Sequence, residues 1–178
     1  MVMQKNWYAV YTRPQSEKKV AALFIKKKME TFIPMVYVKT KTFMRNKFIF
    51  EPLLKSVVFV NAAPEDILLL KQTNGVINLL YWLGKPAIIA TEEITAIKEF
   101  TENYRNIKLE PAFVNNNEEI DNFNESSISI EGRLYALKNK TIKINLPSLG
   151  YCLVAQLEEE SIFVRDNPLI QNYRLAHS

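Results

Sequence analysis

The chain has 178 residues, of which 48% are hydrophobic and 24% charged, with four glycines, one cysteine and one histidine. This composition excludes disorder of the whole chain, a collagen-like repeat, a disulfide scaffold, a four-cysteine zinc site and a multi-histidine metal centre. Residues 1–100 carry 15 Lys and Arg against 8 Asp and Glu, a net charge of +7, whereas residues 101–178 carry 8 against 11, a net of −3. This asymmetry predicts a module that faces a polyanion, joined to a module with another task.

The sequence predicts a protein of the cytoplasm that does not enter the membrane. No apolar h-region of a signal peptide precedes the first strand-like run, and no apolar stretch approaches the roughly 20 residues that a membrane-spanning helix needs. The lone Cys152 is compatible with a reducing compartment.

The first half of the chain predicts alternating strands and helices. Residues 7–12 are aromatic and β-branched and predict a strand, and Pro14 predicts the start of a helix that runs to about Lys28, with Thr12 and Gln15 as a capping box. Further strands are predicted at residues 31–38, interrupted by Pro34, and at residues 56–60, a buried central strand. Between them, residues 37–50 predict a hairpin that turns at Arg45-Asn46 and carries a basic rim.

The remaining elements divide the chain into two parts. Helices are predicted from Pro64 to Asn74-Gly75 and from Thr91 onward, with a strand at residues 76–83 between them. This α+β domain ends near residue 104, and a polar linker follows at residues 105–127. Short strands are then predicted within a small β-barrel at residues 128–165, before a C-terminal tail at residues 166–178; these strands are residues 128–137, 141–146, 151–157 and 162–164.

An ordered set of motifs over residues 6–100 resembles the N-terminal domain of NusG-like transcription elongation factors. The set comprises Trp7-Tyr8-Ala9-Val10-Tyr11-Thr12-Arg13-Pro14, Glu17-Lys18-Lys19-Val20, Glu51-Pro52-Leu53, Val58-Phe59-Val60, Gly75-Val76, Leu83-Gly84-Lys85-Pro86 and Glu92-Glu93-Ile94. The set is more specific than any one motif, and it is most similar to specialised paralogues of the UpxY type. Residues 131–157 resemble the latter part of a KOW domain, a small SH3-like barrel.

The resemblance implies a fold and a function without catalysis or cofactor. The implied α+β fold has an antiparallel sheet flanked by helices, followed by an all-β SH3-like KOW barrel. In this family the N-terminal domain binds the clamp helices of the largest subunit of bacterial RNA polymerase and suppresses pausing, and UpxY-type members act as antiterminators on long operons for surface polysaccharide. The barrel is implied to bind a ribosomal protein or another transcription factor.

Carried over by position, the resemblance assigns site residues of two kinds. The polymerase-binding candidates are the aromatic residues Tyr11, Phe59 and Trp82, for each of which packing in the core is the alternative interpretation. The candidates near non-template or upstream DNA are basic, and for each of them a solvated surface charge is the alternative; they are Arg13, Lys18, Lys19, Lys39, Lys41, Arg45 and Lys47.

Two observations limit this interpretation. Leu54-Lys55-Ser56-Val57 stands where the family usually has Phe-Pro-x-Tyr, so this place lacks two aromatic residues and, with them, a means of stacking on a flipped DNA base. No Walker loop, GxGxxG or GxSxG motif is present, and the acidic clusters lack a histidine, which predicts no enzyme and no metal site. The alternative function is an RNA- or ribosome-binding module in which the barrel is the main functional part.

Overall fold

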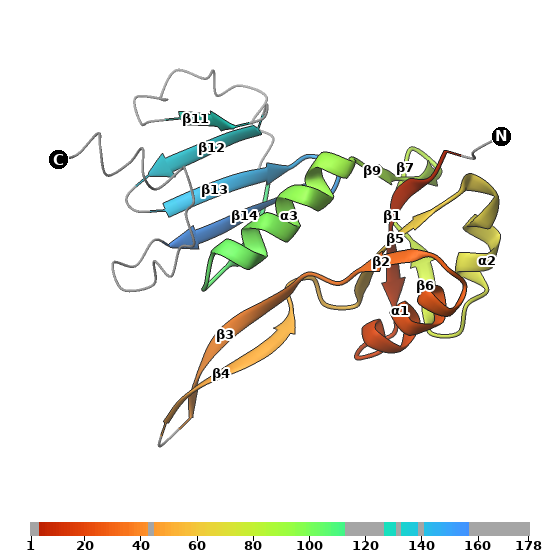
Figure 1. Cartoon of the computed structure of the whole chain (residues 1–178), viewed down its shortest axis with the longest axis horizontal. Coiled ribbons are helices and arrows are strands. Elements are labelled where there is room, and N and C mark those ends of the chain that lie inside the picture. The colour runs from red at the N-terminus through yellow and green to blue at the C-terminus, as the bar shows by residue number, and fades with distance from the viewer. Residues whose placement is uncertain (1–3, 43–44, 113–126, 131–132, 139–140, 157–178) are drawn as a thin grey trace. The chain divides into compact units, whose positions relative to one another are not determined.

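The computed structural model describes residues 4–42, 45–112, 127–130, 133–138 and 141–156. The chain divides into two compact units, residues 1–101 and 102–178 (Figure 1). As predicted, helices and antiparallel strands alternate in the first unit, and strands follow in the second.

The first unit is built on a five-stranded antiparallel sheet of the order β2-β5-β1-β6, with β9 also paired to β1. Its strands are β1 (Asn6–Thr12), β2 (Glu30–Phe32), β5 (Val57–Ala62), β6 (Val76–Leu79) and β9 (Ile88–Ile89). Its helices are α1 (Glu17–Lys26), the 3-10 turn η1 (Pro64–Asp66), α2 (Ile67–Lys71) and α3 (Thr91–Asn103). Two further ladders join β3 (Met35–Thr42) to β4 (Arg45–Pro52) and β7 (Tyr81–Trp82) to β8 (Lys85–Pro86).

The core of this unit lies between the sheet and helices α1 and α2. Val20 and Phe24, four residues apart on α1, share one face and are completely buried, as helical periodicity predicts. They pack with Val10 of β1, Val58 of β5 and Leu70 of α2. Because side chains alternate along a strand, the odd-numbered residues of β1 and β5 belong to the opposite face of the sheet.

Helix α1 begins later than the sequence predicts. Gln15 adopts a left-handed backbone with φ of 61°, and Ser16 is the N-cap residue but makes no side-chain capping bond. The prediction of a capping box between Thr12 and Gln15 is therefore wrong. Pro14 lies in a turn ahead of the helix, and a left-handed non-glycine residue cannot be recognised from propensity alone.

The β3–β4 hairpin forms where it was predicted, but its turn is displaced. Thr42 pairs with Arg45, so the chain reverses at residues 43–44, and Arg45 and Asn46 already belong to β4. Pro34 separates β2 from β3, as predicted. The strand predicted at residues 76–83 is divided instead into β6 and β7, since the Leu80 N–H donates to the Ala9 carbonyl while its own carbonyl accepts from Ala87 N–H.

The second unit contains a five-stranded antiparallel sheet of the order β10-β14-β13-β12-β11. Its strands are β10 (Lys108–Pro111), β11 (Ser127–Ile130), β12 (Arg133–Lys138), β13 (Thr141–Leu146) and β14 (Tyr151–Gln156). Strand β10 lies inside residues 105–127, which were predicted as a linker, so the predicted linker begins too early. The four residues of β10 are too short a run to be recognised as a strand beside an asparagine-rich segment, and pairing with β14 stabilises the strand.

Closure of this sheet into a barrel stays a prediction. In the described part of the second unit, β10 and β11 are the two edges of an open sheet. The strand predicted at residues 162–164 and the tail at residues 166–178 lie outside the described residues.

Candidate functional site

Two of the predicted aromatic residues, Tyr11 and Phe59, share one face of the main sheet. Ala9 pairs with Phe59 and Tyr11 with Val57, so Tyr11 and Phe59 are diagonal neighbours on the face opposite α1. Their exposure differs sharply: Tyr11 is 41% exposed, whereas Phe59 is 0% exposed and stacks on Phe32 with ring centroids 6.1 Å apart. Of these two residues, Tyr11 exposes its ring to solvent, whereas Phe59 is packed within the fold.

The third aromatic candidate, Trp82, lies on a separate ladder. It ends β7 at a tight turn and is 66% exposed. The next residue, Leu83, has a φ of 49° and is 91% exposed. A left-handed backbone costs a leucine about 1–2 kcal/mol, and no burial of its side chain offsets this cost.

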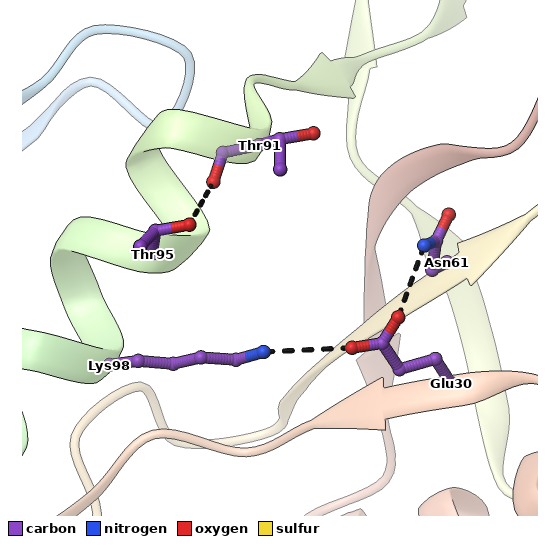
Figure 2. Close-up of polar contacts among 5 residues, drawn as sticks. All are labelled: Glu30, Asn61, Thr91, Thr95 and Lys98. Carbon is purple, nitrogen blue, oxygen red and sulfur yellow. Dashed lines mark hydrogen bonds and ion pairs between the residues drawn. The ribbon is translucent and has the colours of Figure 1, made fainter.

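Helix α3 is connected to the face of Tyr11 and Phe59 through Lys98. The Lys98 ammonium lies 3.6 Å from the Glu30 carboxylate on β2 and 5.3 Å from the ring centroids of both Trp7 and Phe32. The second Glu30 oxygen accepts a hydrogen bond of 3.2 Å from the Asn61 amide on β5 (Figure 2). Lys98 thus attaches α3 to β1 and β2 by one ion pair and two cation–π contacts.

A cleft of about 540 Å³ opens at the start of α1, beside the base of the β3–β4 ribbon. Its lining includes Lys18 of α1 and Lys55 and Ser56 of the connection between β4 and β5. Glu17 is buried, and its carboxylate accepts a 2.7 Å hydrogen bond from the Ser56 N–H. The Ser56 carbonyl accepts from the Thr12 N–H at 2.8 Å, so residue 56 is held from two sides.

The predicted basic residues fall into two groups. Arg13, Lys18 and Lys19 are exposed at and before the start of α1, and Lys18 contributes to the cleft. The others occupy the outer part of the ribbon, where the pairing register is described but the side chains are not; they are Lys39, Lys41, Arg45 and Lys47.

Two features of the described residues bear on metal binding and thiol chemistry. No group of three or more His, Cys, Asp or Glu residues there is arranged to hold a metal ion. Burial raises the pKa of the Cys152 thiol, Lys143 opposes this shift and Glu110 adds to it, so the thiol is poorly reactive. Among the residues with described positions, no helix is long and apolar enough to span a bilayer.

Several residues of these surfaces were not identified from the sequence. Tyr37 and Phe50 form an exposed aromatic pair across the ribbon, with ring centroids 4.8 Å apart. The alternating pattern of residues 37–50 was a signal for their pairing, but not for their exposure. Glu17 and Lys98 gave no signal, because their partners are 39 and 68 residues away in the sequence.

Comparison with known proteins gives one family match. The model of the NusG family, described as "Transcription termination factor nusG", matches residues 5–98. No curated protein matches the chain.

Solved structures give weaker similarities. The structure titled "Domain interaction in Thermotoga maritima NusG" is 15% identical, with a TM-score of 0.43, and the match covers 86% of this chain and 98% of that one. A crystal structure of the MjSpt4:Spt5 complex is 19% identical, with a TM-score of 0.33, and the match covers 84% of this chain and 99% of that one. The assignment depends on the family model, which spans more than half of the chain: the protein belongs to the NusG family of transcription factors.

Proposed function

We propose that the protein is a specialised NusG paralogue of the UpxY type, a non-catalytic elongation and antitermination factor. It binds RNA polymerase through residues 1–104 and promotes processive transcription of a long operon for surface polysaccharide. The observation that carries this proposal is the exposed ring of Tyr11 on the sheet face that also contains Phe59. A large, rigid aromatic ring with exposed apolar area is the kind of residue that dominates protein interfaces.

In this proposal Tyr11 and Trp82 contact the clamp helices, and Phe59 supports Tyr11 from within the fold. The basic residues at the start of α1 and on the ribbon lie near non-template or upstream DNA, and the +7 charge of the first half favours this placement. The second unit, a KOW-type barrel, binds a protein partner, such as a ribosomal protein or another transcription factor, since the net charge of −3 on residues 101–178 disfavours nucleic acid.

The test is the affinity of the full chain for purified bacterial RNA polymerase. Tyr11→Ala is expected to weaken binding about 10-fold or more, the effect typical of an interface anchor. Tyr151→Ala is the matched control, because Tyr151 is exposed to 38%, close to Tyr11, but belongs to the second unit. Phe59→Ala is unsuitable, because emptying a buried aromatic site costs about 3–5 kcal/mol of stability.

Equal affinity of the Tyr11→Ala and Tyr151→Ala variants would contradict the proposed surface. A wild-type chain that fails to bind polymerase at low salt would contradict the function itself. If the second unit then bound RNA, the alternative function of an RNA- or ribosome-binding module would replace the proposed transcription function.

A further inference from the structure

The turn between α2 and β6 contains a chemically reactive dipeptide, Asn74-Gly75. Of the four glycines in the sequence, Gly75 alone follows an asparagine. Asparagine loses its side-chain ammonia most readily before glycine, because glycine has no Cβ to hinder attack of its amide nitrogen on the asparagine side chain. The proposed function does not use this dipeptide.

The backbone of this turn is held at both ends, whereas its middle peptide group is not. The Val76 N–H donates to the Thr73 carbonyl at 3.1 Å. Asn74 and Gly75 are the two central residues, and the positive φ of Gly75 is that of a type II turn. The Gly75 carbonyl accepts the Arg13 N–H at 2.9 Å, but the Gly75 N–H has no acceptor among the described residues.

The first residue of the turn connects it to two helices. Thr73 is buried, and its hydroxyl accepts the Lys27 ammonium, at the end of α1, at 2.8 Å. The same hydroxyl donates to the Leu69 carbonyl of α2 at 2.8 Å. The turn therefore joins α1, α2, β6 and, through Arg13, the end of β1, so a change in the length of its backbone disturbs all of these connections.

The side chain of Asn74 is accessible to water. Asn74 is exposed, and its amide has no hydrogen-bond partner in the part of the chain that the structure describes. Asn78 of β6 is exposed as well, but the next residue is Leu79, whose N–H already donates to Asn78 Oδ1 at 2.9 Å. Asn78 is thus an internal comparison, with similar exposure but without the reactive neighbour.

We propose that Asn74 is a site of spontaneous deamidation in the folded protein, and that the isoaspartate formed there destabilises the first unit. The Gly75 nitrogen loses its proton to solvent and bonds to Asn74 Cγ, while the bond from Cγ to Nδ2 breaks and Nδ2 leaves as ammonia. Water then opens the cyclic imide: attack at Cγ gives aspartate, and attack at the main-chain carbonyl carbon gives isoaspartate. One water is consumed and one ammonia released, and no oxidant or reductant takes part.

The two products have different effects on the fold. Isoaspartate adds one methylene group to the main chain directly before Gly75. The added length moves the Gly75 carbonyl away from the Arg13 N–H, or moves Gly75 against Val20, whose Cγ2 would lie only 2.9 Å from a Cβ at position 75. Aspartate keeps the main chain and adds only a charge on an exposed side chain, so it leaves these contacts in place.

The test is ageing of the full chain in a mildly alkaline buffer, followed by peptide mapping with mass spectrometry. Conversion of Asn74 is expected to accumulate with time, mainly to isoaspartate, because the main-chain carbonyl of the imide is the more electrophilic one. Asn78 in the same chain is expected to stay unchanged. The chain unfolded in urea is the positive control and is expected to react faster, since the folded turn must open before the ring closes.

A second readout separates the backbone from the charge. The midpoint temperature of the first unit is expected to fall by about 4–8 °C in the purified isoaspartate form, the shift typical for loss of one hydrogen bond in a domain of this size. Asn74→Ser cannot form the imide and is expected to keep its midpoint temperature through the same ageing. Freshly purified Asn74→Asp is expected to unfold at the temperature of the wild type.

Four results would overturn the proposal. They are an unconverted Asn74 in the folded chain after the urea-unfolded chain has reacted fully, equal conversion of Asn74 and Asn78, an isoaspartate form as stable as the wild type, and a fresh Asn74→Asp variant as unstable as the isoaspartate form. These measurements use no polymerase, so their outcome is independent of the proposed function.

Discussion

At the scale of single residues, Gly75 is fixed by two independent constraints. It has a φ of 94°, in the left-handed region, and a Cβ added there would lie 2.9 Å from Val20 Cγ2 of α1. Its carbonyl also accepts the Arg13 N–H at 2.9 Å. The close approach of backbone to helix requires the absence of a side chain.

Gly75→Ala is expected to lower the free energy of unfolding by roughly 2–5 kcal/mol, as the sum of backbone strain and overpacking against Val20. Gly84→Ala is the matched control, because Gly84 has a φ of 76° but no atom within 4 Å of an added Cβ. It carries the strain alone and is expected to lose about 1–2 kcal/mol. Urea unfolding measures both variants, and equal losses would show that the contact with Val20 relaxes freely.

The candidate site shows what the sequence can identify at this scale. The positions of Tyr11 and Phe59 on one sheet face follow from the alternation of side chains along paired strands, once the pairing is known. Their different exposure does not follow, because the burial of Phe59 depends on Phe32, which lies 27 residues away in the sequence. Exposure of the Tyr37–Phe50 pair likewise does not follow, because it depends on a ribbon to which no third strand pairs among the described residues.

At the scale of elements, the strands and helices with strong periodicity were predictable, and their ends were not. The buried strand β5 and the inner face of α3, with Ile94, Ile97 and Phe100, occur as their patterns predict. The start of α1 was missed because Gln15 is left-handed, and β10 because its stability comes from pairing with β14. Local sequence sets the type of an element, whereas tertiary contacts set where it begins.

Lys98 contributes to the attachment of α3 to the sheet. Lys98→Met keeps the aliphatic stem but removes the ion pair with Glu30 and the contacts with Trp7 and Phe32. The expected loss is about 1 kcal/mol, because the groups are partly exposed and solvent weakens their attraction. Lys98→Glu is expected to cost more, since it places a second carboxylate beside Glu30.

Thermal unfolding followed by near-ultraviolet circular dichroism measures this effect, because the signal of the buried Trp7 reports on the sheet face. Lys26→Met, at an exposed position on α1, is the control for the loss of one lysine charge. A Lys98→Met variant as stable as Lys26→Met would mean that Lys98 does not hold α3 to the sheet.

At the scale of the whole molecule, each unit contains its own buried residues. Val10, Val58 and Phe24 belong to the core of the first unit, whereas Ile144 and Leu153 are buried in the second. Two separate cores predict two unfolding transitions rather than one cooperative step.

Calorimetry of the full chain is expected to resolve these two transitions. Gly75→Ala is expected to lower the midpoint temperature of the transition of the first unit. Leu153→Ala empties a buried leucine site at a cost of about 2–5 kcal/mol and is expected to lower the midpoint temperature of the transition of the second unit. If each variant displaced both transitions equally, the two units would unfold as one.

The two hydrogen bonds at Ser56 have a mechanical consequence. At the base of the ribbon the Leu53 N–H donates to the Pro34 carbonyl at 2.8 Å, and the chain then reaches Ser56 three residues later. Ser56 is held to α1 by Glu17 and to the end of β1 by Thr12. A displacement of the ribbon is therefore passed through Ser56 to the helix and strand that border Tyr11, and through Pro34 to β2, so the ribbon and the Tyr11 surface are mechanically coupled.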